Sequence, residues 1–107
     1  MYQLCFYVPT SHLESVKAAL FAAGAGKLGA YEGCCWQTLG QGQFKPLANS
    51  RPFIGEAQTV SQVEEYKVEM VCAESCLNAV LQALREAHPY EEPAYHAYKI
   101  LTQADNL

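Results

Sequence analysis

The side chains best suited to chemistry gather in one short stretch, residues 88–95. It reads His-Pro-Tyr-Glu-Glu-Pro-Ala-Tyr and places one imidazole and two carboxylates beside two prolines. Imidazole and carboxylate groups together can hold a divalent metal such as Zn²⁺, which takes three or four such ligands. The candidate ligands for a small molecule or metal are His88, Glu91 and Glu92, and any further ligand would come from His12, His96 or a neighbouring subunit.

The same stretch also has a purely structural interpretation. It follows a helical pattern directly, and a cationic His88 at the helix C-terminus would be favoured by the helix dipole. Pro89 and Pro93 fix their own φ angles and hold the preceding residues extended, so the loop is stiff. A stiff polar loop suits a ligand, a subunit contact or a sharp turn from helix to strand. The sequence therefore leaves both interpretations open.

Residues 24–29, Gly-Ala-Gly-Lys-Leu-Gly, match the bare pattern of a dinucleotide-binding loop. The context does not fit, because the glycines follow a helix and precede a strand, whereas pyrophosphate binding requires the reverse order. We interpret the segment as a turn that uses positive φ angles. A weak anion site formed by backbone N–H groups and Lys27 is the alternative.

The remaining reactive residues predict no catalysis. Five cysteines lack a CxxC pair and are expected to be reduced, most of them buried as small apolar side chains, with a soft-metal site between subunits as the alternative. No Ser/His/Asp or Cys/His set has a recognisable spacing. We therefore predict no catalytic residues, no cofactor-binding residues and no enzyme activity.

Composition and length limit the class of protein to which this chain can belong. A chain of 107 residues is the size of a single domain, predicted to span 1–107. The net charge is −4 with seven scattered basic residues, which argues against a nucleic-acid partner. No apolar run is long enough for a membrane span, and the N-terminal residues lack a signal-peptide pattern, so a cytoplasmic location is expected. Only 17% of residues are charged, which indicates that part of the surface is covered in an oligomer.

The hydrophobic periodicity predicts four strands and two helices. Ser11 and Glu14 form a potential capping box for the first helix, and Gly24 is a suitable stop. Gly40-Gln41-Gly42 is expected to turn the chain, with residues 43–45 returning as a short strand. A long loop over 46–62 follows. The predicted main strands are 2–8, 34–39, 65–72 and 95–101, and the second helix is 75–87.

This order is β-α-β-β-α-β, which predicts an α+β, ferredoxin-like fold with two helices on one face of an antiparallel sheet. The other face of the sheet would carry Cys5, Tyr7 and Val71. These residues are too apolar for a solvated surface, so we expect this face to pack against other subunits. The alternative is that the long loop folds back over it.

The short motifs of this sequence resemble those of two known families. Residues 88–93 resemble the His-Pro-Tyr-x-x-Pro signature of CutA proteins. A larger set of motifs, spread over nearly the whole chain, resembles the insert domain of the bacterial Nif-three-like proteins and its stand-alone relatives. That set comprises Tyr7-Val8-Pro9, Gly24 to Cys34 with Cys35-Trp36, Gly42-Gln43-Phe44, Pro52-Phe53-Ile54-Gly55 and residues 88–95.

The resemblance implies a CutA-like or PII-like fold, usually a homotrimer with the sheets packed inward. Residues 40–62 would then occupy the place of the partner-contacting loop of PII proteins. CutA relatives are associated with divalent-cation tolerance, which favours a divalent metal at His88 and Glu92. The core of the Nif-three-like family that binds two metals is expected to be absent, so its metal-dependent hydrolysis is not carried over.

We therefore predict a non-enzymatic, regulatory trimer that binds a small ligand or divalent metal between subunits. The cleft would be edged by the 24–33 turn, the 40–62 loop and the 88–93 loop. The alternative is a protein-interaction module that acts through residues 46–62. The identity of the ligand and of any protein partner stays open. The loop residues predicted to make contacts are Lys27, Tyr31, Trp36, Arg51 and Phe53.

Overall fold

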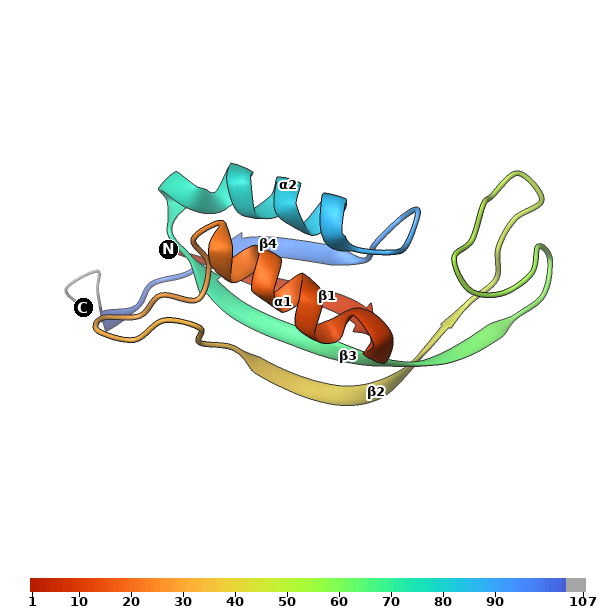
Figure 1. The fold of residues 1–107 in the computed structure, drawn as a ribbon, viewed down its shortest axis with the longest axis horizontal. Coiled ribbons are helices and arrows are strands. Elements are labelled where there is room, and N and C mark those ends of the chain that lie inside the picture. The colour runs from red at the N-terminus through yellow and green to blue at the C-terminus, as the bar shows by residue number, and fades with distance from the viewer. Residues whose placement is uncertain (104–107) are drawn as a thin grey trace.

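The computed structural model describes residues 1–103 and consists of a sheet covered by two helices (Figure 1). Short 3₁₀ turns precede both helices. The strands are β1 (Tyr2–Pro9), β2 (Trp36–Phe44), β3 (Ser61–Cys72) and β4 (Tyr95–Lys99), the helices are α1 (Leu13–Ala22) and α2 (Leu77–Ala87), and the 3₁₀ turns are Thr10–His12 and Glu74–Cys76.

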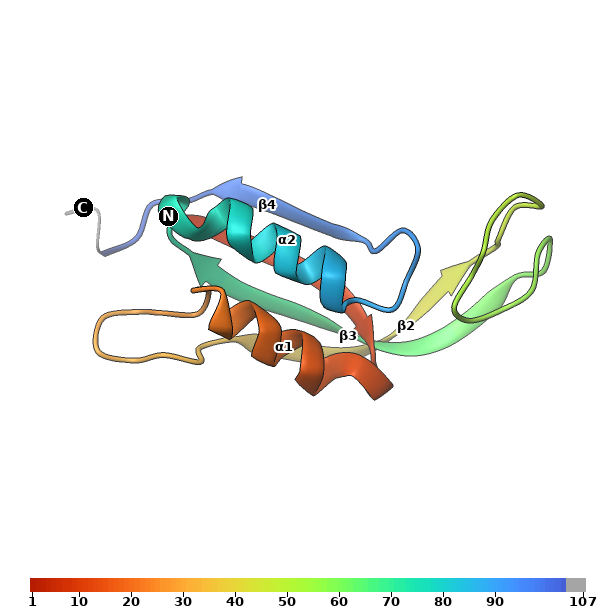
Figure 2. The ribbon, with the colours of Figure 1, turned by 45° about the horizontal axis from the view of Figure 1, so that its top comes forward.

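The four strands are antiparallel in the order β2-β3-β1-β4. Both helices lie on the same face of this sheet, as the two ribbon views show (Figures 1 and 2). The predicted ferredoxin-like fold is therefore confirmed. Among the described residues, no helix is long and apolar enough to cross a membrane.

The core lies between the sheet and the helices. Alternate residues of β1, namely Leu4, Phe6 and Val8, point to this side and are fully buried. Because side chains alternate along a strand while those of a helix repeat every 3.6 residues, one face of each element suffices to fill the core. The helices contribute the buried side chains Leu13, Val16, Leu20, Val80 and Leu84.

The first helix ends as predicted and begins differently. The amide of Gly24 donates to Phe21 O, and the amide of Ala25 donates to Leu20 O, which is the Schellman arrangement at a helix C-terminus. Gly24 has φ of +115°, which glycine adopts without a β-carbon penalty. The capping box was wrong, because Ser11 lies in the 3₁₀ turn and its hydroxyl bonds the neighbouring His12 Nδ1 at 2.8 Å.

The predicted turn at Gly40-Gln41-Gly42 was also wrong. Strand β2 runs straight through it to Phe44 and pairs with a longer β3 that starts at Ser61. Strand β2 is at the edge of the sheet, and glycine within a strand often marks the close approach of another group. A β-carbon at Gly42 would overlap the Glu65 carboxylate, so this glycine makes room for a neighbouring side chain. Cys34 and Cys35, predicted within the strand, precede it.

The two long loops lie at opposite ends of the molecule (Figure 1). Residues 45–60, which we call the arm, connect β2 to β3 at one end. The 24–33 turn lies at the other end, where the amide of Gly26 donates to Val71 O. Positive φ angles at Gly24, Gly26 and Gly29 confirm that this glycine-rich segment is a turn.

The sheet face opposite the helices, which we call the open face, has a mixed composition. By register it carries Cys5 and Tyr7 of β1 and Val71 of β3, as predicted, but also Lys67 and Glu69. Cys5 is nevertheless buried, and burial raises the pKa of its thiol. The arm does not cover this face, since Trp36 and Tyr98 remain 69% and 49% exposed.

Candidate ligand pocket

His88 is a buried structural residue that ties the segment after α2 to β1. Its ring is 6% exposed, Nε2 lies 2.6 Å from Tyr7 O, and Nδ1 lies 3.1 Å from the amide nitrogen of Tyr90. A carbonyl can only accept and an amide can only donate, so these contacts assign a neutral ring with its proton on Nε2. Burial lowers the pKa of His88, which favours the same neutral form.

Glu91 holds the arm against the segment after α2. One of its carboxylate oxygens accepts a hydrogen bond of 2.6 Å from the backbone amide of Arg51. Within the arm, the amide of Gln58 donates to Pro46 O at 2.6 Å, and Pro46 is buried. The arm is therefore a folded unit with a polar attachment to residues 88–94.

Aromatic rings form the second attachment. Tyr90 lies between Phe44 at the end of β2 and Phe53 in the arm, with ring centroids 6.2 and 6.4 Å away. Phe53 also meets the His12 ring edge-on at 5.3 Å. These separations are in the range in which aromatic pairs attract one another. They bring together the end of the sheet, the start of α1 and the arm.

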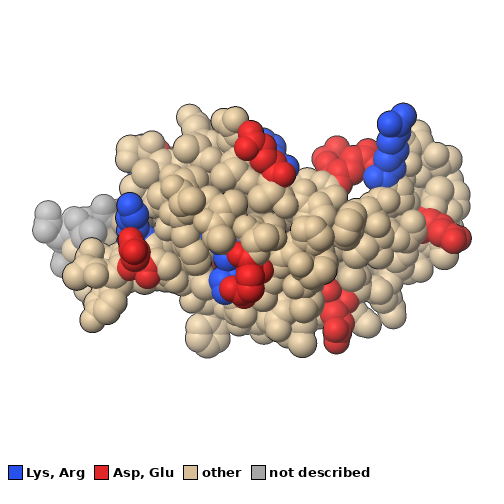
Figure 3. All heavy atoms as spheres, viewed as in Figure 1, with Lys and Arg blue, Asp and Glu red and all other residues tan. Residues whose placement is uncertain are grey.

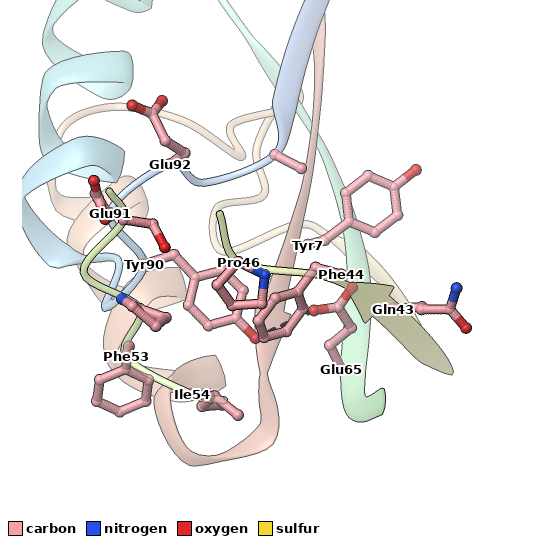
Figure 4. Close-up of a pocket in the computed structure, with 13 residues that line it drawn as sticks. Tyr7, Gln43, Phe44, Pro46, Phe53, Ile54, Glu65, Tyr90, Glu91 and Glu92 are labelled. Atoms are coloured by element: carbon pink, nitrogen blue, oxygen red, sulfur yellow. Dashed lines mark hydrogen bonds between the residues drawn. The ribbon is translucent and has the colours of Figure 1, made fainter. Parts of the chain in front are cut away.

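A pocket of about 300 Å³ lies where the arm, residues 88–94 and the end of the sheet meet (Figure 4). Its wall includes four aromatic side chains and two prolines, with Phe44, Pro46 and Tyr90 grouped at the centre of the view. A volume of this size is at the lower end of the range for small-molecule sites. The predicted candidates Glu91, Glu92 and Phe53 line it, whereas His88 does not.

The polar group nearest these rings is the Glu65 carboxylate. It lies 3.4 Å from the Tyr90 hydroxyl, and Figure 4 marks this contact with a dashed line. Partial burial raises the pKa of Glu65, while the hydrogen bond from Tyr90 opposes that shift. Burial, with the nearby Glu65 charge, raises the pKa of Tyr90 to about 12, so the phenol stays protonated and donates.

The predicted metal ligands do not form a metal cluster in one copy of the chain. Both ring nitrogens of His88 are engaged, Glu91 binds the arm, and Glu92 extends away from the Tyr90 ring (Figure 4). Across residues 1–103, no three His, Cys, Asp or Glu side chains are placed to hold an ion. The donors present therefore do not fit a divalent metal within a single subunit.

The other predicted contact residues are distributed over both ends of the molecule. Lys27 and Tyr31 are exposed in the 24–33 turn, away from the pocket. Trp36 is exposed at the start of β2, and its indole N–H donates to the Thr38 hydroxyl at 3.1 Å. Arg51 is exposed in the arm next to pocket residues. We predicted that the 24–33, 40–62 and 88–93 loops edge one cleft. Within a subunit only the last two meet.

Among the pocket residues that were not predicted as site residues, Glu65, Tyr90 and Phe44 make the contacts described above. Tyr90 and Phe44 belong to the motifs quoted above, and their place in those motifs was the available signal. No feature of the sequence pointed to Glu65. Its place in the pocket depends on strand β3, which begins at Ser61, four residues before the predicted start. The long-range pairing of Gly40 with Glu65 places this carboxylate at the pocket.

Solved structures with the same fold include CutA proteins. The PII-like protein CutA from Nostoc superposes with a TM-score of 0.67 at 14% identity, covering 97% of this chain and 85% of that one. The periplasmic divalent cation tolerance protein CutA from Archaeoglobus fulgidus gives 0.65 at 16%, covering 99% and 93%. At these identities the likeness shows the fold alone. The chain thus has the ferredoxin-like fold that is also seen in CutA proteins.

Closer likeness is found in sequence. A GTP cyclohydrolase 1 type 2 homolog from Halalkalibacterium halodurans is 40% identical over 107 residues, all of this chain and 29% of that protein. The one from Bacillus subtilis is 44% identical over 98 residues, 92% of this chain and 26% of that protein. The Bacillus cereus protein related to NIF3 superposes with a TM-score of 0.76 at 36% identity, covering 91% and 24%.

No family model matches the chain. The relatives nevertheless show that the chain is similar to one segment of NIF3-like proteins. The chain spans between a quarter and a third of the length of these relatives. The predicted resemblance to both CutA and the Nif-three-like proteins is confirmed.

Proposed function

We propose that this chain is a non-enzymatic domain that binds a small organic ligand in the pocket beneath the arm. The observation that supports this most is the joining of two sequence-distant loops, 45–60 and 88–94, around one aromatic cavity. Loops positioned by a rigid scaffold are where binding sites concentrate. His88 makes the scaffold rigid at this point, because it fixes the segment that carries Tyr90 and Glu91.

The proposed ligand site extends to a second subunit. Tyr7 and Glu65 line the pocket and also line a second depression on the open face with Lys67 and Glu69. We propose a homotrimer in which open faces pack together, so that a neighbouring copy completes the site. The exposed Trp36 and Tyr98 on that face support this assembly, since large aromatic side chains are typical of interfaces.

Amide chemical-shift mapping tests the ligand site. A set of small metabolites, nucleotides, Zn²⁺ and Cu²⁺ is titrated separately into labelled protein. Saturable shifts at Phe44, Phe53 and Tyr90 are expected for at least one organic compound. Phe53→Ser should weaken that binding, whereas Leu47→Ser, an exposed arm residue outside the pocket lining, should not. Saturable binding of a metal alone, with shifts centred on His88 and Glu92, would contradict the proposal and support the predicted metal site.

Sedimentation tests the assembly. The wild-type chain is expected to sediment as a trimer at micromolar concentration. Trp36→Glu places a charge on the open face and should shift the protein toward monomer. Leu47→Glu, a matched apolar-to-acid change in the arm, should not. A wild-type monomer over the whole concentration range would refute the trimer.

Protein interaction through the arm is a second candidate, favoured by exposed apolar side chains at Leu47 and Val60. Phe53 and Ile54 are poor probes of it, because both line the pocket and Phe53 packs on Tyr90. The double change of Leu47 and Val60 to Ser tests it more cleanly. Loss of a co-purifying partner with ligand binding intact would support this function over the first.

A further inference from the structure

The charge of the pocket lining selects among ligand classes. Three carboxylates line it, from Glu65, Glu91 and Glu92, and none of the described lining residues is Lys or Arg. In the space-filling view, acidic atoms lie at the notch between the helical layer and the arm, with one basic side chain beside them on the arm (Figure 3). Arg51 is beside the pocket in sequence but lies outside the lining. The lining residues themselves therefore offer an anionic ligand such as a phosphate no cationic side chain.

Glu65 is the carboxylate best placed to meet a ligand. Glu91 already accepts the Arg51 amide, and Glu92 extends away from the rings. Glu65 is held over Gly42, where a β-carbon would displace it, and its hydrogen bond from Tyr90 is long at 3.4 Å. The ion pair found among residues 1–103 joins Lys17 to Glu14 and leaves Glu65 without a cationic partner. Its carboxylate therefore retains acceptor positions and an uncompensated charge.

The aromatic wall favours the same ligand chemistry. The faces of Phe and Tyr rings attract cations within about 6 Å of the ring centroid. Phe44, Phe53 and Tyr90 form one connected group of rings beside Glu65. A carboxylate accepts two parallel hydrogen bonds from a planar guanidinium or amidinium group. The aromatic rings do not favour a metal ion, because they supply no ligand atoms for it.

We infer that the pocket selects an organic cation, a planar amidinium or guanidinium group that binds the Glu65 carboxylate and packs against Phe44 and Tyr90. This inference rests on the proposed function and specifies its ligand class. The group could belong to a free metabolite or to an arginine side chain of a polypeptide. The chemistry that recognises it is the same in both cases.

Three probes of equal shape test the inference: benzamidinium, neutral benzamide and anionic benzoate. Each is titrated into the full chain at pH 7.5 and followed by amide chemical shifts. Benzamidinium should bind saturably with shifts at Phe44, Glu65 and Tyr90, at least about tenfold more tightly than benzamide, because charge-assisted hydrogen bonds are roughly twice as strong as neutral ones. Benzoate should not bind.

Glu65→Gln supplies the matched variant. It keeps the side-chain shape and should abolish the preference for benzamidinium over benzamide. Glu64→Gln, the exposed neighbour on the same strand, should retain it. Amide spectra of both variants verify that the fold is intact. An unchanged preference in Glu65→Gln would overturn the inference.

The outcomes separate this inference from the proposed function. Equal or tighter binding of benzamide or benzoate in the pocket would overturn the cation class while supporting a small-ligand site. Absence of binding by all three probes would overturn the inference, and the metabolite titration would then decide the proposed function independently. Agmatine and a capped Gly-Arg-Gly peptide carry the same guanidinium group. Tighter binding of one of them identifies a free or a polypeptide source.

Discussion

The Nε2 atom of His88 lies 2.6 Å from the carbonyl oxygen of Tyr7, across 81 positions of the chain. This bond joins the end of α2 to β1 at the rim of the pocket. The Tyr90 amide then donates to the other ring nitrogen of the same imidazole. One neutral histidine thereby sets the position of Tyr90, the residue that contacts Glu65, Phe44 and Phe53.

Replacing His88 should change both the stability and its dependence on pH. Because the folded state lowers the pKa of His88 below 6.5, the unfolded chain takes up the proton first as pH falls. The contribution of His88 to stability is therefore complete above about pH 6.5 and declines below it. His88→Gln should cost about 1–3 kcal/mol at neutral pH, since it removes hydrogen bonds from two partly buried backbone groups.

Urea unfolding between pH 5 and 8, at one protein concentration, measures this effect. The wild-type chain should lose stability toward pH 5, and His88→Gln should show a flatter profile. His96→Gln removes an exposed histidine and should preserve the wild-type slope. A wild-type stability that rises on acidification through this range would contradict the neutral assignment of His88.

Gly24→Ala should destabilise the end of α1. The residue has φ of +115°, and a new β-carbon would lie 2.8 Å from Cys76 Sγ. A non-glycine residue in such a conformation costs about 1–3 kcal/mol. Gly40→Ala is the control, because its β-carbon would meet no heavy atom of the described residues within 4 Å and its φ lies outside the left-handed range. Equal urea midpoints for both variants would refute the steric argument.

Glu91→Ala should remove the polar attachment of the arm without unfolding it. The backbone amide of Arg51 loses its carboxylate acceptor and should exchange with solvent several-fold faster in hydrogen-exchange NMR. The Gln58 amide, bonded to Pro46 within the arm, should keep its protection. Glu92→Ala is the matched acidic control. Simultaneous loss of protection at Arg51 and Gln58 would mean that the arm unfolds instead of detaching.

Tyr90→Phe should raise the pKa of Glu65. Burial already places that pKa above 4.5, and the Tyr90 hydroxyl opposes the shift by stabilising the carboxylate. Removing the hydroxyl leaves desolvation uncompensated. Side-chain carbon NMR across pH 3–7 measures the titration of Glu65. Tyr66→Phe, in strand β3 beside Glu65, provides the control. A lower Glu65 pKa in Tyr90→Phe would contradict the proposed hydrogen bond.

Local patterns predicted the elements wherever one face of an element is buried. The alternation Leu4, Phe6, Val8 and the helical repeat of Val80 and Leu84 are direct consequences of a two-layer core. The stop at Gly24 follows from a conformation that other residues rarely adopt. These features depend on neighbours within a few residues, so they are legible along the chain.

The errors arose where distant segments decide the outcome. Gly40-Gln41-Gly42 is a strand because β3 pairs with it and Glu65 occupies the space above Gly42. His88 was predicted either as a metal ligand or as a cationic helix cap. The hydrogen bonds with Tyr7 and Tyr90 assign a neutral ring, which corrects the cationic form of the cap, while the metal-ligand role stays a prediction.

By itself, the amino-acid sequence determined the two-layer architecture, the family likeness and the proline-containing loop at 88–93, because periodicity, turn residues and short motifs are local properties. Tertiary structure alone decided which side chains share a cavity. Glu65, Tyr90 and Phe53 come from a strand, a loop and the arm, and only packing between them creates an aromatic wall beside an uncompensated carboxylate.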